Sequence, residues 1–146
     1  MPPPLHRILT LGRRAWCDLV RAQGALLKAQ WRFLQEPIGA LAIRDASGTL
    51  SASGDAERAR QLAVAVQRAA AHGVFRPYCL VQTLALRELL LAERIEGASI
   101  RIGVRRDRGA FQAHAWIRWG DQILGDRPEH VATFTEVDDL RVMGNR

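Results

Sequence analysis

The hydrophobic positions follow a helical period in the first two thirds of the chain and a strand period after that. Across residues 55–72, apolar residues recur at every third or fourth position, so they share one helix face. They are Ala59, Leu62, Ala63, Val66 and Ala70. Asp55 is a suitable N-cap and Gly73 is a suitable C-terminal stop. A helix is therefore predicted over residues 55–72.

Residues 80–96 predict a second helix that is apolar on almost all sides. Pro77 favours a helix start just before it, and Gly97 is placed to end it. A helix with so little polar surface is expected at the centre of the domain. Residues 5–34 also show a helical pattern, which Gly12 and Gly24 could interrupt.

The last third of the chain alternates apolar and polar residues, as half-buried strands do. Strands are predicted over residues 100–104 and 111–117, joined by a turn at residues 106–109 that ends in glycine. A further turn at residues 119–121 leads into a short strand over residues 122–125. The predicted fold class is α+β, with helices followed by a small antiparallel sheet.

The chain of 146 residues has the length of one compact domain. We expect residues 55–146 to form its core, and residues 1–54 to form a helical extension and a turn-rich linker. The sequence contains no internal repeat and no low-complexity tract. A single domain over residues 1–146 is therefore predicted.

The formal net charge is +6, and among 21 basic residues only Lys28 is a lysine. The arginines are scattered through every predicted element, whereas a nucleic-acid footprint is concentrated on one face. We therefore expect solvated basic faces and no nucleic-acid partner. An acidic protein or peptide partner is the alternative.

The two cysteines, Cys17 and Cys79, have no spacing typical of a disulfide framework or a zinc site. His6, His72 and His130 are not spaced as metal ligands, so neither a metal nor a cofactor is predicted. No apolar run approaches the roughly 20 residues of a membrane span, and the proline-rich N-terminus does not resemble a signal peptide. A cytoplasmic location is expected, because a reducing compartment suits a working thiol.

Cys79 is the clearest candidate for a reactive residue. In the first turn of its predicted helix, unpaired backbone N–H groups and the positive end of the helix dipole favour a thiolate and can hold an oxyanion. His114 follows in a predicted strand, and a helix-start cysteine with a strand histidine suggests a nucleophile and its base. The alternative is that Cys79 is a small buried hydrophobe and His114 an ordinary strand residue.

These residues resemble the lasso peptide biosynthesis B2 proteins, which are leader peptidases with a transglutaminase-like, papain-type fold. The resemblance rests on Cys79-Leu80, the Ile-Arg-Ile-Gly-Val strand at 100–104, Phe-Gln-Ala-His-Ala-Trp at 111–116, and Asp126 twelve residues after the histidine. It covers roughly residues 55–126. It implies a central cysteine helix packed on a small antiparallel sheet, and a catalytic set of Cys79, His114 and Asp126.

By this resemblance the chain is a cysteine endopeptidase that removes the leader from a lasso precursor peptide before a cyclase closes the macrolactam ring. The residues before the helix at Asp55 are too few and too helical for the strand-rich recognition domain that some members carry. A separate leader-recognition protein of the B1 type is therefore implied. Two alternatives stay open: a transglutaminase-like acyltransferase that uses an amine in place of water, and a noncatalytic peptide-binding module.

Strand register tests the predicted acid without using the resemblance. Residues paired across an antiparallel hairpin share a face, so His114 is expected to meet Asp126 only if the intervening turn has an odd number of residues. A three-residue turn at 119–121 places them opposite each other. A two-residue turn at 120–121 pairs Asp126 with Ala115, on the wrong face unless a bulge intervenes.

Several other polar residues are candidates with an ordinary structural alternative. Asp121 and Glu129 are rival acids. Gln112 and Tyr78 are polar neighbours for which a structural role is favoured. Trp116 lies on the face of His114, and we expect it to pack in the core because tryptophan is highly buried on average.

The predicted N-terminal helix is strongly basic, and its cations have few acidic neighbours in the sequence. They include Arg13, Arg14, Arg21 and Lys28. The ordinary interpretation is that this helix packs on the catalytic half. The alternative is that it forms a surface for a partner protein or a peptide.

Overall fold

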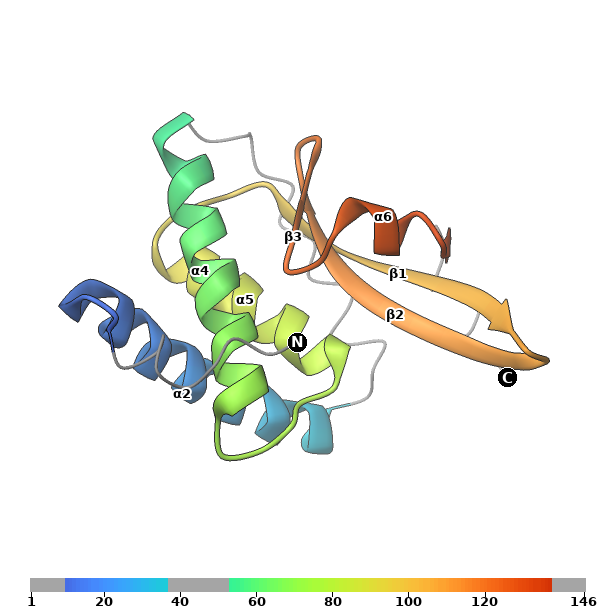
Figure 1. The fold of residues 1–146 in the computed structure, drawn as a ribbon, viewed down its shortest axis with the longest axis horizontal. Helices are drawn as coiled ribbons and strands as arrows, with labels where there is room; N and C mark the ends of the chain where they lie inside the picture. Colours follow the sequence, from blue (N-terminus) through green and yellow to red (C-terminus); the bar gives the residue numbers. More distant parts are fainter. Residues whose placement is uncertain (1–9, 37–52, 138–146) are drawn as a thin grey trace.

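The structure, a computed structural model, describes residues 10–36 and 53–137. Three helices gather on one side of the molecule (Figure 1): α2 (Arg13–Gln35), α4 (Ser53–His72) and α5 (Cys79–Ala92). The strands are β1 (Ala98–Asp107), β2 (Ala110–Trp119), β3 (Gln122–Leu124) and β4 (Thr135–Glu136), with the short helix α6 (Pro128–Val131) before β4. The predicted α+β fold class is confirmed.

The α5 helix is central, as its apolar sequence predicted. It packs against α2 and α4 and also against β1 and β2. Its end comes earlier than predicted, at Ala92, because Arg94 adopts a positive φ of 58°. The backbone N–H groups of Arg94 and Ile95 donate to the carbonyls of Leu91 and Leu90, at 3.0 and 2.9 Å. This Schellman motif turns the chain into β1.

The α2 helix runs unbroken through Gly24, and Gly12 is its N-cap. It buries Ala22, Leu26 and Ala29 against the other helices. The α2 helix is therefore part of the hydrophobic core, together with α4 and α5.

An ion-pair network joins the three helices. Arg58 of α4 donates to Asp18 of α2 at 2.7 and 2.8 Å, and to Glu93, just after α5, at 2.8 Å. Arg21 also reaches Glu93, at 3.3 Å, and Lys28 reaches Glu88, at 3.4 Å. The expectation that Arg21 and Lys28 have few acidic groups to pair with is therefore wrong, because Glu93 and Glu88, which are distant in the sequence, reach them.

The sheet has the strand order β3-β2-β1-β4 and is antiparallel throughout. The turn between β1 and β2 is shorter than the predicted 106–109, because β1 continues to Asp107 and pairs it with Ala110. Arg108 and Gly109 form this two-residue turn, and both have the positive φ that a type I′ hairpin turn requires. The far end of this hairpin projects beyond the helices (Figure 1), which leaves Phe111 and Ala113 exposed. In the part of the chain that the structure describes, no helix could cross a membrane.

Candidate active site

Cys79 is the first residue of α5 and is half-buried. The Thr83 hydroxyl donates to the Cys79 carbonyl at 2.8 Å, and the Gln82 side-chain amide donates to the Pro77 carbonyl at 3.1 Å. These bonds fix the first turn of the helix. The N–H groups of a first turn have no intrahelical acceptor, so the thiol lies where negative charge is favoured.

His114 lies within β2 and shares a pocket with Cys79. The pocket has a volume of about 40 Å³, and Gln82, Ala115 and Gly125 also contribute to its wall. The pocket forms because the start of α5 packs against β2. The structure thus brings together the thiol and the imidazole, which lie 35 residues apart in the sequence.

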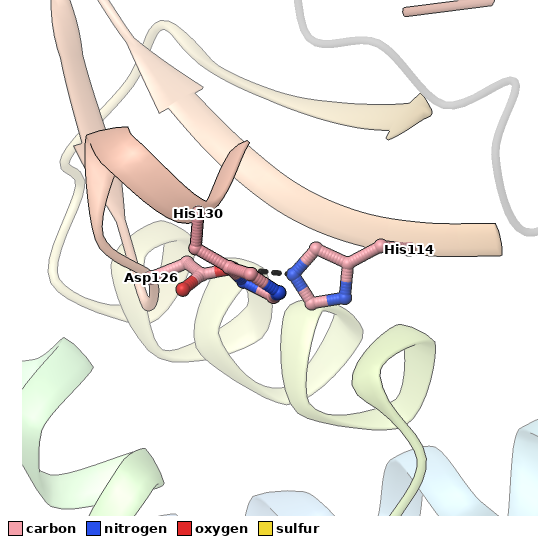
Figure 2. A group of neighbouring side chains, drawn as sticks. All are labelled: His114, Asp126 and His130. Carbon is pink, nitrogen blue, oxygen red and sulfur yellow. Dashed lines mark hydrogen bonds and ion pairs between the residues drawn. The ribbon is translucent and has the colours of Figure 1, made fainter. Parts of the chain in front are cut away.

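Asp126 follows β3 and binds one nitrogen of the His114 ring. Its Oδ2 atom is hydrogen-bonded to His114 Nε2, and the same oxygen receives a bond from His130 Nδ1 at 2.8 Å. Figure 2 shows the three side chains converging. An ionised carboxylate only accepts hydrogen bonds, so both imidazoles donate to Asp126. His114 therefore keeps Nδ1 for a second partner.

The Asp126 carboxyl is held in its ionised form. Burial alone would raise its pKa, but hydrogen bonds from His130, from the Arg127 backbone N–H and from His114 outweigh burial, so the pKa of Asp126 lies below its ordinary value. The Arg127 N–H donates to Oδ1 at 2.7 Å. Both carboxylate oxygens are thus fixed, and an ionised Asp126 can orient His114 and stabilise its protonated form.

Asp126 reaches His114 by a route that strand register did not predict. The β2–β3 turn has two residues, because Trp119 pairs with Gln122 and Ile117 with Leu124. The three-residue turn is therefore wrong, and so is the requirement for an odd number of turn residues. The β3 strand ends at Leu124, and Gly125 has φ +82°. The chain leaves the sheet at this glycine. The Asp126 side chain therefore does not have to lie on the sheet face that a continued register would assign to it.

The sequence spacing predicted no ligand role for His130, and the structure corrects this by placing it beside Asp126 and His114. His130 contacts Asp126 from α6, and its ring lies 4.9 Å from the His114 ring, centre to centre. The ligand atoms of His114, Asp126 and His130 all lie within 4.8 Å of one another, so this group could hold a metal ion. The only sequence signal for His130 is its spacing of four residues from Asp126, and this spacing indicates a contact only if the chain is helical there, whereas no helix was predicted over these residues.

The rival candidates lie elsewhere. Asp121 is exposed in the β2–β3 turn, and Glu129 is exposed on α6. Gln112 accepts a bond from Arg105 at 2.8 Å on the projecting hairpin. Tyr78 is 72% exposed and packs beside Phe33, and Cys17 is exposed on α2. His72 lies at the end of α4, and His6 lies outside the described residues.

Trp116 packs in the core, as predicted, with 2% of its surface exposed. Its ring lies 6.1 Å from the His114 ring in a stacked arrangement and covers Gly103 on the neighbouring strand. A Cβ atom on Gly103 would come within 2.7 Å of the indole. Gly103 therefore makes room for the tryptophan that supports His114.

Comparison with known proteins identifies the family to which this fold belongs. No curated protein and no solved structure matches the chain significantly. Residues 25–138, well over half of the sequence, match the family described as the transglutaminase-like superfamily, and the chain belongs to that superfamily.

Proposed function

We propose that this protein is a cytoplasmic cysteine endopeptidase that removes the leader of a ribosomally made lasso precursor peptide. The transglutaminase-like superfamily includes cysteine proteases and acyltransferases. The observation that carries the proposal is that Cys79 and His114 line one pocket while Asp126 binds Nε2 of His114, which leaves Nδ1 to accept a proton. The leader-peptidase assignment itself rests on the resemblance of the Cys79, His114 and Asp126 segments to the lasso B2 proteins.

Each residue has a defined role in the proposed reaction. His114 accepts the thiol proton at Nδ1, and the Cys79 sulfur attacks the scissile carbonyl. The N–H groups of the first turn of α5 face the developing oxyanion. His114 then returns the proton to the leaving amine, and water releases the acyl group from the resulting thioester.

The test is to incubate the purified chain with lasso precursor peptides, with and without a separate leader-recognition protein, and to identify the products by mass spectrometry. The proposal expects two fragments whose masses sum to that of the precursor plus one water. A product in which an added amine is joined to the new carboxyl end supports the acyltransferase alternative. Peptide binding without any new product supports the noncatalytic module.

We further propose that the separate leader-recognition protein docks on an exposed apolar stripe of α2. Spacings of four, seven, four and three residues place the stripe residues on one side of the helix. They are Trp16, Val20, Leu27, Trp31 and Leu34, and each is between 38% and 72% exposed. An exposed apolar surface of this kind typically marks an interaction site. The cyclase is a further candidate partner, since it would receive the cleaved peptide.

A further inference from the structure

The His114–Asp126–His130 group contains one residue, His130, that the orientation of a catalytic histidine does not require. A single oxygen, Asp126 Oδ2, is bonded by two imidazole nitrogens from separate elements, β2 and α6. The side chains of His114, Asp126 and His130 are 19%, 15% and 37% exposed, so solvent ions can reach the group. One carboxylate is enough to orient a catalytic histidine, and the second imidazole on the same oxygen calls for an explanation.

We propose that these three residues form a binding site for Zn²⁺, and that the bound metal reversibly switches off the active site. Two imidazole nitrogens and one carboxylate oxygen are a ligand set that zinc uses when its fourth position is left open. Magnesium and calcium prefer sets made of oxygen atoms, so the group selects a transition metal over these ions.

The geometry needs only a small change to accept the ion. Zinc bonds of about 2.0–2.2 Å set neighbouring tetrahedral ligand atoms about 3.4 Å apart. The three ligand atoms already lie within 4.8 Å of one another, and His130 Nδ1 is 2.8 Å from Asp126 Oδ2. A slight outward movement of the two rings would open the centre of the group for the metal.

Contacts outside the group support this set of ligand atoms. The Arg127 backbone N–H holds Asp126 Oδ1 at 2.7 Å and leaves Oδ2 to face the histidines. The Phe134 ring lies 5.2 Å from the His114 ring and 5.4 Å from the His130 ring, which limits their rotation. Such outer contacts typically orient metal ligands.

Metal binding and proton transfer exclude each other at His114. When Nε2 donates to Asp126, Nδ1 has a free lone pair that can accept the thiol proton. When zinc occupies Nε2, the ring proton moves to Nδ1, and the imidazole has no lone pair left. Zinc takes the place of the two hydrogens between the imidazoles and Asp126, and those protons move to the opposite ring nitrogens. Cys79 remains uncoordinated.

Binding is tested by calorimetric titration of the full chain with ZnCl₂ at neutral pH, with MgCl₂ as a control. We expect one Zn²⁺ per chain in the parent, in Cys79→Ala and in Cys17→Ala. His130→Ala, and independently His130→Gln, should weaken binding at least tenfold, with retention of the fold checked by circular dichroism. Binding that His130 variants leave unchanged, or that Cys79→Ala removes, would overturn the site. These measurements need no substrate and stand even if the proposed peptidase activity is absent.

The effect on catalysis rests on the proposed function and has its own readout. Zn²⁺ should inhibit cleavage of a precursor peptide, EDTA should restore it, and inhibition should need at least tenfold more Zn²⁺ in His130→Ala, relative to the zinc-free rate of that variant. Alkylation of Cys79 by iodoacetamide, measured at about pH 9, where a thiol ionises without a base, should persist at the inhibiting Zn²⁺ concentration, because the sulfur is not a ligand. If zinc protects Cys79 from alkylation at this pH in step with inhibition, the metal is bound to the thiol and the proposal is wrong.

Discussion

His114 and Asp126 are hydrogen-bonded although the register of their strands does not pair them. The β2–β3 ladder stops at Ile117 and Leu124, and its continuation would have set Asp126 opposite Ala115. The left-handed residue Gly125 turns the chain out of the sheet just before Asp126. The contact therefore depends on where β3 ends as much as on the length of the turn.

This relationship makes Gly125 a residue on which the site depends. Gly125→Ala should cost roughly 1 kcal/mol of stability, because a side chain disfavours positive φ, and relaxation of the backbone should move Asp126 and slow peptide cleavage. Gly109→Ala is the matched control: its φ of +85° is nearly the same as the +82° of Gly125, but it lies in the β1–β2 turn. Thermal unfolding and cleavage rates of both variants give the comparison. Equal loss of activity in both would show that the effect is not local to Asp126.

The thiol assignment predicts that Cys79→Ala abolishes cleavage whereas Cys17→Ala leaves it intact. Cys79 lines the pocket with His114, and Cys17 is exposed on α2. Cleavage of a precursor peptide, measured by chromatography, checks this directly. Activity of Cys79→Ala equal to that of the parent would exclude a thiol mechanism.

Replacement of the base and of its orienting acid should have unequal effects. His114→Ala should lower the cleavage rate about 10²–10⁴-fold, which is the usual contribution of general acid–base catalysis. Asp126→Asn should retain more activity, because an amide can still orient an imidazole although it no longer supplies the negative charge. Single-turnover rates separate the two variants, and full activity of His114→Ala would remove His114 from the mechanism.

Acid should destabilise the protein through the network around Arg58. Hydrogen bonds from Arg58 hold the pKa of Asp18 and that of Glu93 below their ordinary values of 3.8 and 4.5. A carboxyl with a lowered folded-state pKa contributes stability above its unfolded pKa and loses it as pH falls through the folded pKa. We therefore expect the unfolding free energy to fall below about pH 4.

Arg58→Met should remove much of this acid dependence and cost about 3 kcal/mol at pH 7, since the buried Asp18 carboxylate loses both of its hydrogen bonds from Arg58 and keeps only the longer ion pair with Arg21, at 3.7 Å. Asp18 is only 6% exposed. Arg60→Met is the control, because Arg60 pairs with Glu57 on the surface, where an ion pair contributes at most about 1 kcal/mol. Urea unfolding at pH 3 to 7 tests both variants. An unchanged pH profile in Arg58→Met would contradict the assigned role of the network.

The α2 stripe predicts how the recognition protein is bound. Trp31→Ser and Leu34→Ser together should weaken its affinity at least tenfold and slow leader-dependent cleavage, while cleavage at saturating partner concentration is retained. Val64→Ser is the control, because Val64 is 40% exposed but lies on α4. The affinities are measured by titrating the recognition protein over each variant immobilised on a surface. Identical affinity in the stripe variant and the control would leave the stripe without this role.

The exposed arginines at the start of α2 should speed the association of this chain with the leader-recognition protein. Charge reversal of Arg13 and Arg14 should slow partner binding, and added salt should have the same effect on the parent, because exposed charges are screened over about 8 Å at physiological ionic strength. Arg21 is left unchanged because it pairs with Glu93 and Asp18, so its reversal would also destabilise the fold. Unchanged association rates at low salt would contradict this role.

The sequence by itself determined the long helices, the main hairpin and the two residues with the clearest chemistry. The helical and strand periods located α4, α5 and the β1–β2 hairpin, because amphipathic patterns and turn residues act locally. The position of Cys79 at a helix start followed from Pro77 and the apolar run after it. The strand pattern around His114 likewise showed which residues share its face.

Only the tertiary structure decided which side chains meet. Glu93 beside Arg21 and Glu88 beside Lys28 come from the residue after α5 and from α5, and no spacing along the chain indicates these two pairs. His130 joins the site because the α6 turn, four residues long and too short for a periodic pattern, packs over β2. Asp126 reaches His114 through the conformation of one glycine. Contacts between distant segments depend on how whole elements pack, whereas sequence patterns report only the structure of each element.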